Sequence, residues 1–349
     1  MKAHYIKHIL DFKKPSGTSR GVLTEKETWF LIIEKNQKKG IGECSVLRTL
    51  SIDDRPDYEE KLKWVCENIH LGKDLLYKKL TQYPSIQFGV EMVFLSLESD
   101  NPYVLFPSDF TNFNDSILIN GLVWMGSLTN MKRQIEEKIE QGFSCIKLKI
   151  GAIDFEEELS VLRFIRENFN ENSIEIRVDA NGAFSETNAL YKINQLAGYK
   201  LHSIEQPIQK NYTDTMAELC KSKIIPICLD EELIGIFTLE EKKTLLQKVM
   251  PQYIILKPSL IGGFQGTLEW IALANEYNIG WWITSALESN IGLNAITQFT
   301  YTLNCKIPQG LGTGSLYTNN IKSPLFIKNG HIWYDKNVEW DSTLINTDF

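Results

Sequence analysis

The chain of 349 residues lacks the features that mark membrane, secreted and nucleotide-binding proteins. No apolar run approaches the length needed to cross a bilayer, and the N-terminal MKAHYIKHIL has neither the apolar stretch nor the small-residue cleavage site of a secretory signal. The six cysteines include no CxxC pair, which favours reduced thiols over a disulfide framework. No GxGxxG or GxxxxGKS/T segment follows a predicted strand. These absences favour a cytoplasmic globular protein.

Positive charge is also scarce. The chain has 37 Lys and Arg residues against 44 Asp and Glu, which gives a formal net charge of −7 at pH 7. This balance argues against nucleic acid or an anionic membrane as a partner. Hydrophobic residues make up 43% and charged residues 23% of the chain, values typical of a soluble globular protein. The sequence leaves the oligomeric state undecided.

The first hundred residues are typical of an antiparallel sheet followed by helices. The segments TWFLIIE (28–34) and GIGEC (40–44) flank a polar stretch at 35–39, which predicts a hairpin with a longer loop. Helical patterns follow at 58–69 and 86–97. We therefore expect a small α+β domain over residues 1–110, to which the segment 320–349 returns.

Strand-like and helix-like segments alternate after residue 116. Between the strands, Met131, Ile135 and Ile139 recur with the spacing of one helix face. Seven or eight such strands predict a parallel sheet, and a (β/α) barrel over residues 111–319 is its most economical closure. A doubly wound open sheet is the alternative. The predicted strands are 117–121, 145–150, 174–179, 201–205, 225–230, 253–257 and 280–284.

Five successive strands of this series end in a charged residue. The five positions are 25 to 30 residues apart, which is the length of one strand–helix unit. A parallel barrel brings the carboxyl ends of its strands to one rim, so these side chains should converge. They are Lys149, Asp179, Glu205, Asp230 and Lys257.

The three acidic ends, Asp179, Glu205 and Asp230, indicate a metal site. Three carboxylates brought close together repel one another unless a cation lies among them. Oxygen ligands without a neighbouring His or Cys suit a hard divalent ion, Mg²⁺ first and Mn²⁺ second. The alternative is that each acid is a solvated strand end or a helix cap.

The segment CIKLKIG (145–151) places two lysines, Lys147 and Lys149, on one face of a strand and apolar residues on the other. Lys149 lies on the strand before the three acids, and Lys257 lies on the strand after them. A bound metal and neighbouring cations favour a neutral lysine, which is a usable base near neutral pH. Two solvated lysines on an edge strand are the alternative. Arg177 is expected to order a carboxylate, to reach a substrate acid, or to form an ion pair inside the barrel.

Six short motifs follow one another along the chain: KLK (147–149), RVDANG (177–182), IEQP (204–207), LDE (229–231), KPSLIGG (257–263) and SALESNIG (285–292). Together these segments resemble the enolase superfamily, in its muconate-lactonizing subgroup. The resemblance implies a modified (β/α)7β barrel with an N-terminal α+β capping domain. It implies that Asp179, Glu205 and Asp230 bind Mg²⁺ and that Lys149 and Lys257 are catalytic, with Mg²⁺ stabilising an ene-diolate as the superfamily does. The motifs span the predicted barrel, and the resemblance also covers the N-terminal segment, so it extends over most of the chain.

The subgroup includes o-succinylbenzoate synthases, N-succinylamino acid racemases, dipeptide epimerases and muconate-type cycloisomerases. The segment GLGTGSLY (310–317) lacks the Asp-x-Asp with which dipeptide epimerases hold a peptide amino group. The resemblance therefore favours an o-succinylbenzoate synthase of menaquinone biosynthesis, a lyase that dehydrates 2-succinyl-6-hydroxy-2,4-cyclohexadiene-1-carboxylate. The segments 15–23 and 42–51 resemble the two loops that cover the substrate in this subgroup.

The expected partner is thus a small-molecule carboxylate. Glu232 departs from the subgroup, whose members often have a small polar residue there, and it adds an acid near the rim. Two hypotheses from other classes remain, a Schiff-base lyase on the same barrel and a metal-binding protein without activity. The expected substrate contacts are Lys147, Asn181, Ser285, Glu288 and Arg20.

Overall fold

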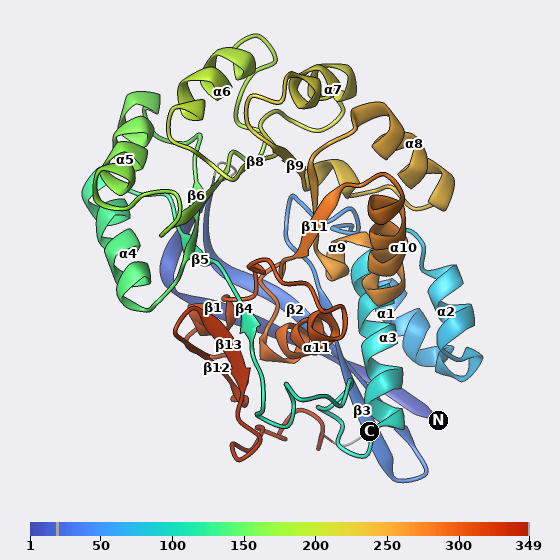
Figure 1. Ribbon diagram of the computed structural model, residues 1–349. Coiled ribbons are helices and arrows are strands. Elements are labelled where there is room, and N and C mark those ends of the chain that lie inside the picture. Colours follow the sequence, from blue (N-terminus) through green and yellow to red (C-terminus); the bar gives the residue numbers. More distant parts are fainter. Residues whose placement is uncertain (19–20, 348–349) are drawn as a thin grey trace.

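The protein begins with a three-stranded antiparallel sheet, β1 (Lys2–Thr18), β2 (Gly21–Lys35) and β3 (Lys38–Ser45), in a computed structural model that describes residues 1–18 and 21–347 (Figure 1). Lys35 pairs with Lys38, and the two residues between them have φ angles of 51° and 66°. The longer loop predicted at 35–39 is therefore wrong. A two-residue turn with positive φ matches the twist of the strands, but Asn-Gln is not its usual sequence signal.

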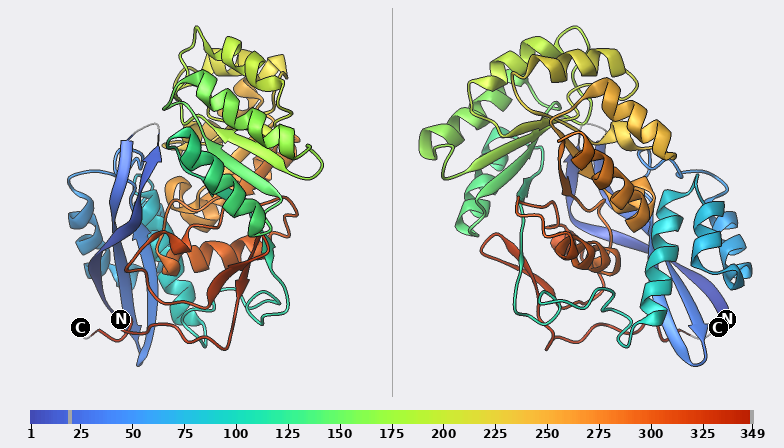
Figure 2. Two further views of the ribbon diagram at one scale, coloured as in Figure 1. Left: turned by 90° about the vertical axis from the view of Figure 1, so that its left-hand side faces the viewer. Right: turned by 45° about the vertical axis from the view of Figure 1, so that its right-hand side comes forward.

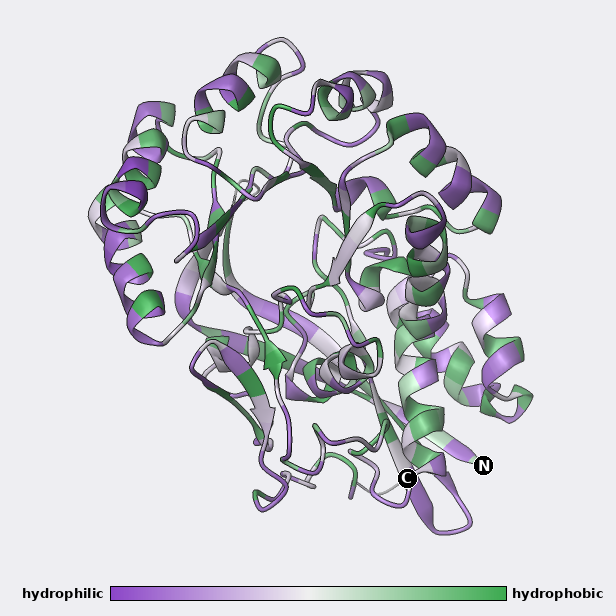
Figure 3. Ribbon diagram, in the orientation of Figure 1, coloured by the Kyte–Doolittle hydropathy of each residue, from purple (hydrophilic) through white to green (hydrophobic). Residues whose placement is uncertain are grey.

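Three helices follow this sheet, α1 (Tyr58–Glu67), α2 (Lys73–Lys79) and α3 (Pro84–Glu98). Of the 15 residues of α3, 13 are buried, so this helix has no solvent-facing side, and most of it is coloured as hydrophobic in Figure 3. Phe88 and Met92 join the main core, whereas Ile86 and Val90 join the core beneath the first sheet. Helix α3 thus belongs to both hydrophobic cores.

The rest of the fold is a closed parallel barrel. Its sheet has the order β5-β6-β7-β8-β9-β10-β11, and residues 309–310 bridge Ile119 on one side and Thr284 on the other. The barrel prediction is confirmed, and the open-sheet alternative is excluded because these bridges close the sheet. The strands are β5 (Gly121–Val123), β6 (Cys145–Lys149), β7 (Glu175–Asp179), β8 (Ser203–Glu205), β9 (Ile227–Leu229), β10 (Tyr253–Leu256) and β11 (Gly280–Ile283).

Helices surround the barrel on its outer side (Figure 1). No helix among the described residues is long and apolar enough to span a membrane. The helices are α4 (Leu128–Glu140), α5 (Phe155–Asn168), α6 (Ala189–Ala197), α7 (Thr213–Ser222), α8 (Leu239–Val249), α9 (Pro258–Ile261), α10 (Gly263–Glu276) and α11 (Asn290–Thr302).

The C-terminal segment first forms a hairpin, β12 (Leu325–Lys328) and β13 (His331–Tyr334), that pairs with β4 (Ile117–Leu118) beside the barrel. Near the end of the described chain, Thr347 Oγ1 lies 3.1 Å from His4 Nε2, and its carbonyl accepts a hydrogen bond from Lys39. Of the segment 320–349, the described part up to Thr347 therefore lies beside the barrel through its hairpin and contacts the first sheet through Thr347. The domain division at residue 110 stays a prediction.

The N-terminal domain docks on the barrel partly through Glu91 of α3. Its carboxylate accepts hydrogen bonds from the backbone amides of Phe264 (2.6 Å) and Gln265 (3.0 Å), in the first turn of α10. A Cβ atom at Gly263 would overlap Glu91 Oε2, and Gly263 has a φ of +68°. The second glycine of KPSLIGG is therefore required by the contact between the two domains as well as by its own backbone.

Candidate active site

The register of the parallel strands places the charged strand ends at one rim. Lys149 on β6 is the direct partner of Asp179 on β7, which in turn is the partner of Glu205 on β8. Glu205 pairs with Cys228, so Asp230 lies two residues further along β9, beyond the strand's end. Lys257 follows β10 directly. The structure thus brings together the five side chains that sequence spacing predicted to converge.

The lysines and carboxylates form buried ion pairs. Lys147 Nζ lies 2.9 Å from Asp179 Oδ2 and also contacts Glu205 Oε2. Lys149 Nζ lies 2.7 Å from the same Asp179 oxygen, and Lys257 Nζ contacts Asp230 Oδ2. Every carboxylate of the three therefore faces an ammonium group, and the two solvated lysines considered as an alternative are excluded by their burial.

Burial disfavours each charge in this cluster, so neighbouring charges decide the protonation states. Burial lowers the pKa of Lys147, but the carboxylates of Asp179 and Glu205 outweigh it and raise that pKa. Burial likewise opposes the charge of Asp179, whose pKa is nevertheless lowered by the three lysines. The pKa of Glu205 is raised well above its ordinary range by burial and by repulsion from Asp179 and Asp230. This cluster favours additional positive charge beside Glu205.

The donor set at this rim fits a hard divalent cation. All three acids offer only oxygen, and Glu205 Oε1 is buried with no hydrogen-bond partner among the described residues. Within residues 1–18 and 21–347, however, no group of three His, Cys, Asp or Glu side chains has an arrangement that could hold a metal ion as it stands. Two carboxylate oxygens at this rim contact ammonium groups, Glu205 Oε2 that of Lys147 and Asp230 Oδ2 that of Lys257.

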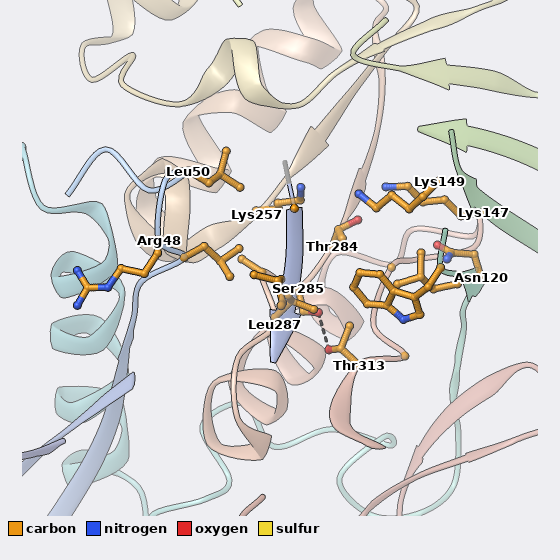
Figure 4. A pocket seen from close by; sticks show the side chains of 18 of the residues that line it. Arg48, Leu50, Asn120, Lys147, Lys149, Lys257, Thr284, Ser285, Leu287 and Thr313 are labelled. Carbon is orange, nitrogen blue, oxygen red and sulfur yellow. Dashed lines mark hydrogen bonds between the residues drawn. The ribbon is translucent and has the colours of Figure 1, made fainter. Parts of the chain in front are cut away.

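A cavity of about 270 Å³ opens above the charged cluster. Figure 4 shows Lys257 on one side of it, pointing toward Lys147 and Lys149 on the other. Apolar side chains form most of the remaining wall, which comes from five segments of the chain. The lining residues that lie outside the charged rim include Gly21, Val22, Leu23, Leu47, Arg48, Thr49, Leu50, Leu122, Trp124, Ser285, Leu287, Gly310, Gly312 and Thr313.

The N-terminal domain covers one side of this cavity. The two segments predicted to cover it, 15–23 and 42–51, supply the lining residues 21–23 and 47–50, and Gly17 forms a bridge with Met125, just after β5. Figure 2 shows the hairpin of β1 and β2 rising alongside the barrel. The cavity therefore lies between two parts of the chain, with ionic groups at the barrel end and apolar groups at the covering end.

Trp124 and Leu122 were not predicted as site residues. They follow the alternation of the first barrel strand toward the cavity, a signal that the sequence carries. The backbone of Trp124 is held on both sides by Gln134 of α4, which accepts from its amide (2.9 Å) and donates to its carbonyl (3.0 Å). This clamp fixes a large aromatic side chain opposite the covering segments.

The other predicted contacts differ in their position. Asn181 accepts a hydrogen bond from Lys149 at 2.7 Å and donates one to Glu231, so it orients the lysine. Ser285 lines the cavity, and its hydroxyl lies 2.7 Å from that of Thr313. Glu288 is fully buried and is not among the lining residues.

Three further predicted residues lie away from the cavity or outside the described chain. Arg20 lies outside the described residues. Arg177 pairs with Glu175 and donates to the Pro308 carbonyl, which is the ion pair inside the barrel. Glu232 accepts a hydrogen bond from Gln206 at 3.2 Å and is held in the loop after β9.

Comparison with known proteins identifies the class. Residues 130–337 match the family model for enolase C-terminal domain-like proteins, which is more than half of the chain. The protein belongs to the enolase superfamily.

Three known proteins align with this chain over almost the whole length of both chains. The chain is 42% identical to the o-succinylbenzoate synthase of Desulfotalea psychrophila, over 95% of this chain and 98% of that protein. The crystal structure of MenC from Desulfotalea psychrophila LSv54 superposes with a TM-score of 0.86 at 40% identity, covering 95% and 99% of the two chains. A muconate lactonizing enzyme from Pseudomonas fluorescens, complexed with muconolactone, has a TM-score of 0.82 at 20% identity, covering 98% and 96%, and shows the fold alone.

Proposed function

We propose that the protein is an o-succinylbenzoate synthase, a lyase of menaquinone biosynthesis. Its reaction would be the syn elimination of water from 2-succinyl-6-hydroxy-2,4-cyclohexadiene-1-carboxylate. The observation that carries the proposal is the 42% identity to a synthase over nearly the full length of both chains. The facing lysines support it, because an elimination of this kind needs a base and a cation around one carbon.

In this proposal Lys149 is the base. Its amine takes the proton from the ring carbon that bears the carboxylate, and the resulting ammonium gives a proton to the departing hydroxyl on the same face. The ring C–O bond breaks, water leaves, and the ring becomes aromatic. The hydrogen bonds to Asp179 and Asn181, both 2.7 Å long, would hold the Lys149 nitrogen in place for both transfers.

The other lysines would keep their charge. Asp230 contacts Lys257, and attraction to this carboxylate raises the pKa of Lys257 against the effect of burial. A cationic Lys257 would stabilise negative charge on the substrate from the face opposite Lys149. Lys147, whose pKa is raised, would remain the permanent counter-ion of Asp179 and Glu205.

We further propose that Asp179, Glu205 and Asp230 would hold Mg²⁺, with Mn²⁺ as an alternative. The oxygen-only donor set and the unpartnered Glu205 Oε1 support this assignment. A bound divalent ion would supply electrostatic stabilisation for charge that develops on the substrate carboxylate. The expected substrate is accordingly a small carboxylate whose apolar ring fits against Trp124 and Leu122.

A direct assay tests the proposal. Purified protein with Mg²⁺ should convert the cyclohexadiene to o-succinylbenzoate, with loss of the diene absorbance. EDTA and Lys149→Ala should each abolish turnover, while Lys221→Ala, whose side chain is 79% exposed on α7, should not. Turnover that survives either treatment would contradict the proposed chemistry.

Two further assays separate the alternative functions. If N-succinylphenylalanine exchanges its α-proton faster than the diene loses water, the protein is a racemase and the two lysines act as bases on opposite faces. Trapping of a substrate by borohydride would instead indicate a Schiff-base lyase.

A further inference from the structure

Outside the charged rim, the described chain holds a second buried cluster of ionic groups, between the first sheet and the barrel. We call Lys26, Glu43 and Glu288 the interface cluster. All three side chains are at most 5% exposed. Lys26 and Glu43 come from the N-terminal sheet, and Glu288 comes from the segment after β11. The proposed mechanism uses none of the three.

Glu43 accepts four hydrogen bonds, one from within the first sheet and three from across the contact with the barrel. Its Oε1 accepts from the Thr28 hydroxyl (2.8 Å) and from the backbone amide of Ser289 (2.9 Å). Its Oε2 accepts from the Ser289 hydroxyl (2.5 Å) and from the backbone amide of Gly292 (2.7 Å). A side chain of the first sheet therefore binds the free amides at the start of α11, where a negative charge is favoured. A Cβ atom at Gly292 would lie 2.8 Å from Glu43 Oε2, so this close approach requires glycine.

The residues just before α11, 285–289, form what we call the wall loop. Ser285 and Leu287 of this loop line the substrate cavity. Leu287 has a φ of 62°, a conformation that is strained for a leucine and persists only where its surroundings impose it. The wall loop therefore depends on its supports for its shape.

Those supports act at both ends of the wall loop. Glu43 holds Ser289 at one end. The carboxylate of Glu288 accepts from the Ser259 hydroxyl (2.5 Å) and from the backbone amide of Ala286 (2.7 Å), which ties the loop to α9, the helix directly after Lys257. Lys26 donates to Ser45 at 2.5 Å, and its charge is attracted by both Glu43 and Glu288.

From these contacts we propose that Glu43 is a positioning residue for the substrate cavity. Its hydrogen-bond partners named above do not line the cavity, but it fixes the wall loop that presents Ser285 and Leu287 to the substrate. This places one determinant of substrate affinity in the N-terminal domain, and it gives Glu288 a supporting position in place of the substrate contact predicted from the sequence. The kinetic part of this inference rests on the proposed synthase function.

The test compares Glu43→Gln with Glu91→Gln. Both variants keep the shape of the side chain and remove a carboxylate that binds a barrel-helix N-terminus, but only Glu43 touches the wall loop. In this proposal the wall loop contacts the substrate equally in the bound state and in the transition state, so Glu43→Gln should raise KM about tenfold and leave kcat within about threefold. Glu91→Gln should leave KM within about twofold.

Hydrogen exchange supplies a readout that does not need turnover. In Glu43→Gln, amides of the peptide that spans residues 286–293 should exchange at least about tenfold faster than in the native protein, and in Glu91→Gln they should not. If Glu43→Gln does not fold, Thr28→Val removes one of the four bonds to Glu43 and should shift KM and exchange in the same direction by a smaller factor.

Each outcome decides the proposal. Unchanged exchange in Glu43→Gln, an unchanged KM despite faster exchange, or an equal rise of KM in Glu91→Gln would overturn it. If the native protein does not dehydrate the diene, the proposed function fails, and the exchange experiment still decides whether Glu43 supports the wall loop.

Discussion

Glu91 should make the stability of this protein fall as the pH rises. Burial raises the pKa of Glu91 from 4.5 to about 7, although the amides of Gln265 and Phe264 act in the opposite direction. Lys73 also lowers this pKa and Glu269 raises it. The folded protein therefore holds this proton over a pH range in which the unfolded chain has released it. Because the folded state binds more protons there, its stability decreases with pH through that range.

The size of the effect follows from the two pKa values. Between pH 5 and pH 8, the native protein should lose about 2 to 3 kcal/mol of unfolding free energy relative to Glu91→Gln, whose amide does not titrate. Urea unfolding followed by tryptophan fluorescence at several pH values measures this difference. A difference between the two proteins that does not change with pH, or that changes with the opposite sign, would refute the reasoning.

Three further outcomes are expected. Gly263→Ala should destabilise the protein by about 3 kcal/mol in the same urea assay, because a Cβ there overlaps Glu91. Gly235→Ala also places alanine at a positive φ, +91°, but no atom lies nearer than 3.5 Å to the added Cβ, so it should cost only about 1 to 2 kcal/mol; equal losses would show that the overlap is relieved. Trp124→Ala should raise KM about tenfold with little change in kcat, because it removes an apolar part of the cavity wall. Steady-state kinetics measure this, with Trp333→Ala on β13 as the control; an equal rise of KM in the control would show that the effect is not specific to the cavity. Glu205→Gln should weaken Mg²⁺ binding at least about tenfold by calorimetry, and undiminished affinity would remove Glu205 from the proposed ligand set.

The barrel and its charged rim could be predicted because both rest on simple periodicities. The strand–helix repeat fixes the architecture, and a parallel register then carries the strand ends to one level, as the pairing of Lys149 with Asp179 and of Asp179 with Glu205 shows. The position of a residue at the end of a strand is thus visible in the sequence.

The partners of these residues were harder to predict. Spacing along the chain does not show that Lys147 pairs with two carboxylates, that Arg177 pairs with Glu175 inside the barrel, or that Glu288 turns away from the cavity toward α9. Such choices depend on side-chain directions, which spacing does not give. Glu43 and Glu91 are harder still to predict, because each binds the start of a helix more than a hundred residues further along the chain.

Helix α3 has a consequence for how the molecule comes apart. Its opposite sides pack into two hydrophobic cores, one in the first hundred residues and one in the barrel. Unfolding of either part would therefore remove side chains from the core of the other. Melting should therefore be one concerted event, with far-ultraviolet dichroism and tryptophan emission changing at the same denaturant concentration. A fragment of residues 111–319 produced alone should be insoluble or loosely folded. A well-dispersed amide NMR spectrum from this fragment would show that the barrel folds without the N-terminal residues.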